Sequence, residues 1–146
     1  MENKVLKSLA DEFSNIHLKS FNQQNLRFSS RFIFSLLINP QISYIYKKNK
    51  GFCIFSINKE DAEIITMAIV PEYQNHGIGF LILSELEEVL LKSNCKKVFL
   101  EVASNNLIAL HLYKKVGFKN FGIRKNYYTI LKDKKVDAIV MEKFLS

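Results

Sequence analysis

Residues 64–79 have the sequence IITMAIVPEYQNHGIG, in which an apolar run closed by Pro71 precedes a turn that contains two glycines. An apolar run of this length, bounded by a proline, predicts a buried strand over about residues 63–70. The residues that follow, FLILSELEEVLL at 80–91, have helical length and periodicity. We therefore expect a strand, a tight turn and a helix from Gly79 to about Ser93.

The turn itself, QNHGIG at residues 74–79, has the features of an anion-binding site. Gly77 and Gly79 have no Cβ, so a ligand can approach the backbone closely. The N–H groups at the start of a helix have no partner within it and lie at its positive end, which suits an anion such as a pyrophosphate. A glycine-bearing turn without a ligand explains the same residues. Two known phosphate loops are excluded, because position 82 is not glycine and no Lys-Ser/Thr pair follows.

The composition is that of one globular domain, which we expect to span residues 1–146. Hydrophobic residues make up 48% of the chain, enough for a single core. No apolar stretch reaches the roughly 18 residues of a membrane span, and the N-terminus lacks the apolar segment of a secretory signal. Cys53 and Cys95 are widely spaced, which favours reduced thiols over a disulfide, and the three histidines lack metal-ligand spacing. We expect a cytoplasmic protein that binds no metal and no membrane.

The formal net charge of +7 suggests nucleic-acid binding as a hypothesis. However, the Lys and Arg residues are spread along the chain, and the densest runs are as short as KDKK at 132–135. No recognised nucleic-acid motif accompanies them, so we expect no direct nucleic-acid binding. A basic surface would still help to capture an anionic cofactor.

The rest of the chain predicts an α/β protein with a mixed sheet. Residues 9–21 have an apolar helical face, with Asp11 and Glu12 near the expected helix start, where they suit the dipole. The strands that end near residues 70 and 102 are joined by a helix and should be parallel neighbours. Hairpins flank this unit, so the sheet should be mostly antiparallel with helices on both faces. The other expected elements are strands at 42–46, 51–57, 97–102, 118–128 and 135–144 and two helices, at 30–37 and from 105 or 106 to 116. The second of these helices should have Ser104 or Asn105 as its N-cap and Gly117 as its C-cap.

A second group of motifs follows the glycine turn. LEVASNN at 100–106 is a strand that ends in an acid and leads to an Asn at a helix start, and ALHLYKKVGF at 109–118 contains Leu-Tyr-x-x-x-Gly-Phe. This order of motifs resembles the GNAT acetyltransferases. IRKNYY at 123–128 and DAIVM at 137–141 resemble the RimI-type branch, the N-alpha-acetyltransferases of bacterial ribosomal protein. The resemblance covers residues 64–143 well and the N-terminal third only in outline.

The resemblance implies the GNAT fold, a mostly antiparallel mixed sheet of six to seven strands with a central parallel pair that splays apart. It implies acetyl-CoA as the donor, bound between the splayed strands. The backbone of residues 67–70 would pair with the pantetheine arm and the acetyl carbonyl, and the N–H groups of residues 76–79 would receive the pyrophosphate. The cofactor-binding residues implied in this way are Met67, Ala68, Ile69, Val70, Gln74, Asn75, His76, Gly77, Ile78, Gly79, Asn106 and Tyr113.

Glu101 is an acid within VFLEV at 98–102, a strand of otherwise apolar side chains. A carboxylate in such surroundings is unfavourable unless it is solvated or paired. Acetyl transfer to an amine requires the ammonium to lose a proton, which a partly buried carboxylate can accept directly or through water. The resemblance assigns the catalytic base, and part of the acceptor site, to Glu101. A strand-end glutamate that reaches solvent or pairs with a lysine is the alternative.

Tyr113 lies on the next expected helix, whose start faces the same cleft. A phenol can protonate the departing CoA thiolate, because the usual pKa values of the two groups, about 10 and 8.5, are close. We therefore assign Tyr113 as the catalytic acid, with a tyrosine that closes the core beside Leu110 as the alternative. The resemblance also implies that Asn106 bonds the pantetheine arm, although an Asn at this position could simply cap the helix.

Tyr127 and Tyr128 match an aromatic pair that resembles the peptide-binding wall of RimI-type enzymes. Adjacent residues on a strand point to opposite faces, so at most one of them should line the site while the other packs. We assign Tyr127 to substrate binding.

The sequence thus predicts an acetyl-CoA-dependent N-acetyltransferase that acts by direct transfer on a protein N-terminus, that of a ribosomal protein. A route through a cysteine intermediate has no support, because both cysteines lie outside the motifs. The same chemistry on a small amine or an antibiotic is one alternative. A non-catalytic acyl-CoA-binding or ribosome-associated module is another, and the retention of both Glu101 and Tyr113 argues against it.

Overall fold

The computed structural model describes residues 2–20, 28–131 and 134–145. The expected helices and strands are present, with bounds that differ by a few residues at most ends. A single turn of 3-10 helix at Pro71–Tyr73 was not expected. The helices are α1 (Glu2–Ser20), α2 (Ser30–Leu37), α3 (Ile78–Lys92) and α4 (Leu107–Lys115), and the strands are β1 (Ile42–Lys47), β2 (Gly51–Asn58), β3 (Asp61–Ile69), β4 (Lys97–Ala103), β5 (Lys119–Leu131) and β6 (Lys134–Phe144).

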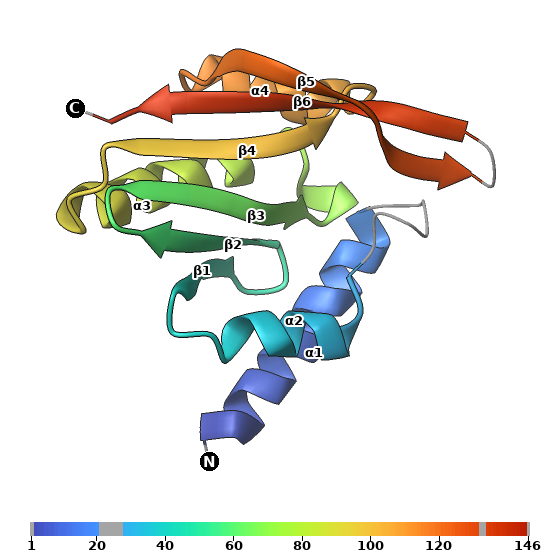
Figure 1. The fold of residues 1–146 in the computed structure, drawn as a ribbon. Coiled ribbons are helices and arrows are strands. Elements are labelled where there is room, and N and C mark those ends of the chain that lie inside the picture. The colour runs from blue at the N-terminus through green and yellow to red at the C-terminus, as the bar shows by residue number, and fades with distance from the viewer. Residues whose placement is uncertain (1, 21–27, 132–133, 146) are drawn as a thin grey trace.

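The strands form one six-stranded sheet in the order β1-β2-β3-β4-β6-β5 (Figure 1). Neighbouring strands are antiparallel except for β3 and β4, which are parallel and joined through α3. The parallel pair therefore lies at the centre of an otherwise antiparallel sheet. The prediction of a mixed, mostly antiparallel sheet with a central parallel pair is confirmed.

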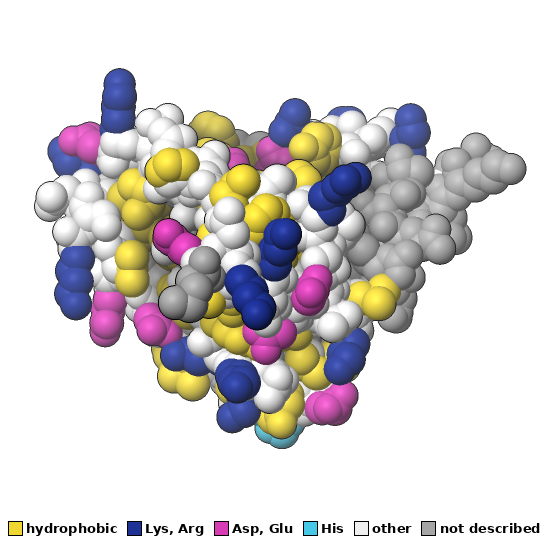
Figure 2. All heavy atoms as spheres, turned by 90° about the horizontal axis from the view of Figure 1, so that it is seen from below, with side chains coloured by type: hydrophobic (Ala, Val, Ile, Leu, Met, Phe, Trp, Pro, Cys, Tyr) yellow, Lys and Arg dark blue, Asp and Glu magenta, His cyan; other side chains and the backbone are white. Residues whose placement is uncertain are grey.

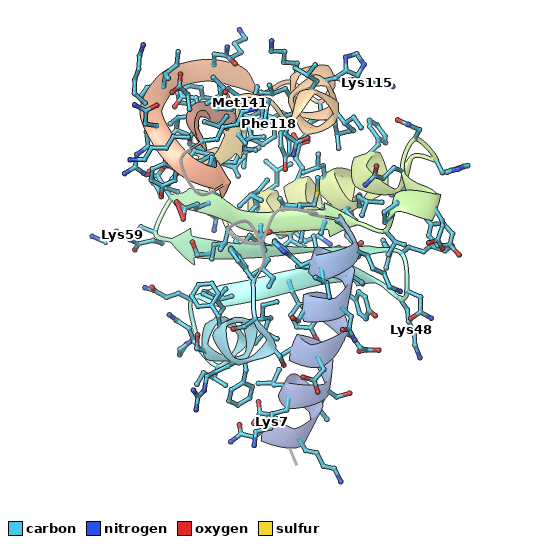
Figure 3. All side chains as sticks on the ribbon, turned by 90° about the vertical axis from the view of Figure 1, so that its right-hand side faces the viewer. Lys7, Lys48, Lys59, Lys115, Phe118 and Met141 are labelled. Atoms are coloured by element: carbon cyan, nitrogen blue, oxygen red, sulfur yellow. The ribbon has the colours of Figure 1, made fainter. Side chains whose placement is uncertain are left out.

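Helices cover both faces of the sheet, as the alternation of side chains in β2 shows. Cys53 and Phe55 belong to a core that contains buried residues of α3 and α4. Phe52 and Ile54 point the other way, into a core formed with α1 and α2. Successive strand residues point to opposite faces, so this one buried strand serves two cores. Figure 3 shows Phe118 and Met141 inside the first core, between β6 and α4.

A β-bulge at Ile65 divides β3 into two parts. Ile54 of β2 pairs with Thr66, whereas the next residue, Phe55, pairs with Ile64, so Ile65 is an extra residue on β3. A one-residue shift reverses which side chains face each core. Parallel pairing of β3 with β4 ends at Ile64 and Leu100, directly before the bulge. The two strands are therefore paired at one end and unpaired at the other.

The N-terminal helix is longer than expected. It begins at Glu2 rather than near residue 9, so Asp11 and Glu12 lie in its middle and not in its first turn. The prediction that they suit the helix dipole is wrong for this reason. Asp11 instead accepts a hydrogen bond from Ser30 at the start of α2. The apolar face was correctly located, since Phe13 and Ile16 are buried against the sheet.

Figure 2 shows the molecule from below, where positively charged Lys and Arg side chains are interspersed with negatively charged Asp and Glu side chains. Several of the surface lysines pair with acids, as Lys47 does with Glu85 at 2.6 Å and Lys143 with Glu87 at 2.9 Å. Across the described ranges, none of the helices combines the length and the apolar character that crossing a membrane requires.

His17 gives the fold a testable pH dependence. It is buried in α1, its ring stacks on Phe28 at 4.7 Å, and its Nδ1 accepts from the Phe28 N–H at 3.2 Å. Burial lowers the pKa of His17 from 6.5 to about 4. The folded protein then binds this proton less tightly than the unfolded chain, so the stabilisation is present above pH 6.5 and is lost as the pH falls to about 4.

We expect His17 to account for a loss on the order of 3 kcal/mol in the free energy of unfolding between pH 7 and pH 4. The variant His17→Asn keeps a hydrogen-bond acceptor and does not titrate, so it should lose correspondingly less over the same interval. Urea unfolding of both proteins at the two pH values measures the difference. Equal losses in the two proteins would show that His17 does not titrate differently on folding.

Candidate active site

A cleft of about 440 Å³ opens where β3 and β4 stop pairing. One wall is β3 from residue 64 to 69, and the other is β4 from residue 100 to 103. The end of α1, the start of α4 and one tyrosine of β5 close it, through Ser20, Asn106, Tyr113 and Tyr128 among others. A separate hollow of about 300 Å³ between α3, the end of α4 and the end of β6 contains none of the predicted site residues.

The backbone of β3 offers hydrogen-bonding groups to this cleft at alternate residues. Val70 N–H donates to Lys50 O at 2.8 Å, so the backbone groups of Ala68 and Val70 face β2. The groups of Met67 and Ile69 then face the unpaired side, toward the cleft. The expectation that all four residues from 67 to 70 present their backbone to a cofactor is corrected to these two.

The carbonyl of Ile69 already has partners on the cleft side. Gln74 Nε2 donates to it at 3.0 Å, and the Ser20 hydroxyl lies 2.8 Å from it. Gln74 therefore ties the glycine turn back to the end of β3, a role that the sequence did not suggest. Ser20 was not singled out either, because a serine at a helix end has many structural uses.

The glycine turn has the geometry expected of an anion-binding helix start. Asn75 and Gly77 both have left-handed backbone, with φ of 64° and 83°. Gly77 is the residue before α3, and within the described part of the chain no side chain caps this helix. Leu81 makes the first backbone hydrogen bond of the helix, to Gly77 O at 3.0 Å. The preceding N–H groups therefore remain available at the positive end of a 15-residue helix.

The two glycines of the turn serve different purposes. A Cβ on Gly77 would meet no atom within 4 Å, whereas a Cβ on Gly79 would lie 2.6 Å from Leu112 Cδ2 of α4. A Cβ on Gly79 would require the Leu112 side chain to shift, so this glycine favours close contact between α3 and α4. The missing Cβ of Gly79 thus has a packing role that the sequence did not suggest.

Asn106 is the N-cap of α4, and its Oδ1 accepts from Ala109 N at 3.2 Å. The predictions of Ser104 or Asn105 as the cap are wrong by one or two residues. Gly117 follows the helix with φ of 104°, as expected of a glycine at a helix end. The capping alternative for Asn106 is therefore observed, and the side chain also lines the cleft.

Glu101 faces the cleft from β4 but is not isolated among apolar groups. Arg124 of β5 donates to its Oε1 at 2.6 Å, and the Glu101 side chain is 25% exposed. Glu63 of β3 lies on the same face of the sheet, and its pKa is raised by burial and by the nearby charge of Glu101. The sequence assigned no role to Arg124 or Glu63. The available signal for Arg124 was its place in the same short motif as the tyrosine pair, IRKNYY at 123–128.

Tyr113 lines the cleft from α4 and is otherwise buried. Burial raises the pKa of its hydroxyl well above the usual value, with smaller contributions from Cys53 and Tyr128. The close match with a thiol pKa that the sequence suggested is therefore not present in the folded protein. A raised pKa keeps the hydroxyl protonated throughout the neutral range, so it remains a hydrogen-bond donor toward the cleft.

The tyrosine pair does not alternate as a regular strand would. Tyr128 lines the cleft, whereas Tyr127 is 47% exposed and contacts both Arg124 and the Tyr128 ring. The register of β5 on β6 shifts between Arg124 and Tyr128, and Asn126 has left-handed backbone with φ of 53°. Because the strand is irregular here, the expectation of opposite faces is wrong, and Tyr128 takes the place in the wall that we assigned to Tyr127.

Both cysteines are buried and free. Within residues 2–20, 28–131 and 134–145, no group of three or more His, Cys, Asp or Glu side chains is arranged to hold a metal ion. The described side chains that line the cleft include the carboxylate of Glu101 and the phenols of Tyr113 and Tyr128.

Comparison with known proteins identifies the family. A sequence model described as the acetyltransferase (GNAT) family matches residues 4–118. The chain belongs to the GNAT acetyltransferase family. Enzymes of this family transfer the acetyl group of acetyl-CoA, which is therefore the cosubstrate of this one.

Relatives of this GNAT chain include two bacterial proteins that are named for the same activity. A Bacillus subtilis (strain 168) protein, provisionally named a ribosomal protein bS18-alanine N-acetyltransferase, is 36% identical over 114 residues, 75% of this chain and 74% of the relative. The Escherichia coli (strain K12) ribosomal protein bS18-alanine N-acetyltransferase is 35% identical over 94 residues, 64% of this chain and 63% of the relative. That second match spans less than two-thirds of the E. coli protein.

The fold agrees with these sequence matches. The crystal structure of the ribosomal-protein-S18-alanine N-acetyltransferase from Escherichia coli has a TM-score of 0.82 to this GNAT chain at 25% identity. The superposition covers 95% of this chain and 89% of that one. The GNAT fold predicted from the motifs is therefore confirmed.

Gly77 allows a test of the anion site that leaves helix packing intact. In Gly77→Ala the left-handed backbone becomes strained, and the turn should relax and displace the N–H groups from a bound pyrophosphate. We expect acetyl-CoA to bind about 2- to 30-fold more weakly by calorimetry, the equivalent of roughly 0.3 to 2 kcal/mol for the helix-end interaction. Gly117→Ala introduces similar strain at a distant helix end and is the matched control. Equal affinities for the two variants would remove the turn from the cofactor site.

Proposed function

We propose that this enzyme acetylates the N-terminal α-amine of a ribosomal protein, with the N-terminal alanine of bS18 as the first candidate. The relatives that match by sequence and the E. coli structure that matches by fold are named for this acceptor. The observation that carries the proposal is that Glu101 and Tyr113 line one cleft formed by the unpaired ends of β3 and β4.

On the donor side, the proposal places the pantetheine arm of acetyl-CoA along the open edge of β3. Met67 and Ile69 offer backbone groups there, and Asn106 lines the cleft from the start of α4. The N–H groups at residues 77–80 would receive the pyrophosphate, next to the exposed side chains of Asn75 and His76. The thioester would then lie between β3 and β4, near Tyr113.

On the acceptor side, the α-amine would enter from the face on which Glu101 and Tyr128 lie. Glu101 would take a proton from the ammonium, and the free amine would attack the acetyl carbonyl carbon. The new C–N bond forms as the C–S bond breaks, and Tyr113 would donate its proton to the departing sulfur. The nitrogen, which still carries one proton more than an amide, would return that proton to the Tyr113 oxygen, directly or through water. Transfer is direct in this scheme, because Cys53 and Cys95 are buried and neither lines the cleft. Acetylation of a ribosomal protein in this way would occur in the cytoplasm.

Mass spectrometry of acetylated products tests the function. The purified protein is incubated with acetyl-CoA and a panel of acceptors: a peptide with the N-terminal sequence of the organism's own bS18, the same peptide with a blocked N-terminus, polyamines and aminoglycosides. We expect one acetyl group on the free peptide and none on the blocked one, which retains its lysines. Preferential acetylation of a polyamine or an aminoglycoside would contradict the protein acceptor and leave acetyl transfer intact.

A further inference from the structure

The ion pair between Arg124 and Glu101 places a cation on the atom that the proposed mechanism uses as a base. Arg124 Nη1 lies 2.6 Å from Glu101 Oε1. The guanidinium is also centred 4.2 Å above the ring of Tyr127. Arg124 itself is 53% exposed, so it reaches Glu101 from the solvent side of the cleft. The hydrogen bond to Glu101 raises the pKa of Arg124, which remains cationic at every working pH.

An irregular segment of β5 puts Arg124 in this position. Arg124 pairs with Ala138 of β6 and Tyr128 with Val136, so three residues of β5 lie opposite Asp137 alone. The Asp137 carboxylate accepts from the Asn126 N–H at 2.9 Å and holds the bulge. The bulge brings the Arg124 side chain and both tyrosine rings to the mouth of the cleft.

An acceptor ammonium and this guanidinium have the same requirements. Both are cations that donate hydrogen bonds, and both are stabilised by the Glu101 carboxylate. Two cations at one carboxylate repel each other. We propose that Arg124 is a positioning residue, which holds Glu101 in the unliganded enzyme and gives up this position to the ammonium of the acceptor. The inference rests on the proposed function, since it needs an amine that reaches Glu101.

Replacing Arg124 by the acceptor ammonium at Glu101 requires little free energy. A partly exposed ion pair contributes little in water, because solvent already stabilises both charges. After the exchange, Arg124 can keep its contact with the Tyr127 ring, which interacts favourably with a cation. The acceptor therefore competes with an occupant that is held weakly and that remains close by.

Removal of Arg124 should change acceptor binding and leave donor binding as it is. Without the competing cation, the KM for the bS18 peptide should fall by about two- to fivefold. The KM for acetyl-CoA should not change. The described titratable groups that act on Glu101 are Arg124 and Tyr128 from β5 and Glu63 from β3.

Steady-state kinetics of the full chain with acetyl-CoA and the bS18 peptide test the proposal. The proteins are wild type, Arg124→Gln, Arg124→Lys and Lys125→Gln. The last removes one positive charge from an exposed neighbour and is the matched control. Arg124→Gln should show the lower peptide KM with an unchanged KM for acetyl-CoA. Arg124→Lys should fall between it and wild type, and Lys125→Gln should match wild type.

A peptide KM that is unchanged or higher in Arg124→Gln would overturn the exchange. That result would leave Arg124 as a surface ion pair or as a direct contact of the peptide. The proposed function is contradicted by a different result, namely that the wild-type protein acetylates no peptide. Should wild type prefer a small amine, the same comparison is made with that amine, because the exchange needs only an ammonium.

Discussion

Replacement of Glu101 by glutamine should lower kcat by about 10²- to 10⁴-fold, or roughly 3 to 5 kcal/mol in the activation barrier. Glutamine keeps the shape of the side chain, and its carbonyl oxygen can still accept the hydrogen bond from Arg124. It cannot accept a proton from the acceptor ammonium. Folding should therefore survive, which thermal unfolding checks, and the acid limb of the pH profile should disappear with the rate.

Glu63→Gln is the matched control for this prediction. Glu63 lies on the adjacent strand, on the same face of the sheet, and interacts electrostatically with Glu101. Its replacement should alter the rate by no more than a few-fold. If Glu63→Gln abolishes turnover and Glu101→Gln does not, the base is Glu63 and the assignment to Glu101 is wrong.

The second large effect is expected for Tyr113→Phe, which removes one hydroxyl and almost no volume. The thiolate then departs without a proton donor, so kcat should fall by about 10²-fold or more. The KM for acetyl-CoA should stay nearly constant, because the hydroxyl acts on charge that develops only in the transition state. Rapid-quench or steady-state kinetics measure both quantities, and activity should recover partly with an acetyl donor whose thiol leaves more easily.

The pH dependence provides a check on the same residue. Burial raises the pKa of Tyr113, so its acidic form persists beyond the usual phenol value of about 10. Wild-type kcat should therefore show no alkaline decline from Tyr113 below about pH 10. Tyr128→Phe removes a second hydroxyl from the same cleft and should reduce kcat less. A Tyr113→Phe enzyme with normal turnover and weakened cofactor binding would mean that Tyr113 only packs.

Much of this fold could be predicted because the buried face of a helix or strand gives its apolar residues a regular spacing in the sequence. The apolar run before Pro71 and the helical pattern after Gly79 identified β3 and α3, and the loop between them placed the glycine turn. The order of the strands around α3 required the parallel pair. Helix ends were less well located. The start of α1 was missed because its first turns are mostly exposed and so have no apolar face to detect.

For the candidate site, the sequence predicted on which element each residue lies, but it did not predict which side chains surround that residue in the fold. It placed Glu101 at the end of a strand and Tyr113 on the following helix, and the structure brings both to one cleft. It gave no indication that Arg124, 23 residues away along the chain, would pair with Glu101. It also assigned the cleft wall to the wrong tyrosine of the pair, because strict alternation fails where β5 bulges.

What the sequence by itself determined is the type and order of the elements, the burial of the strand over about residues 63–70, and the glycine turn at the start of the helix that follows it. These properties depend on neighbours along the chain and on the average polarity of each face. Only the tertiary structure decided that the bulge at Ile65 ends the pairing of β3 with β4, that Gly79 packs on Leu112, and that Arg124 holds Glu101. Each of these joins residues distant in sequence, and such contacts follow from strand register and helix packing, which no local pattern encodes.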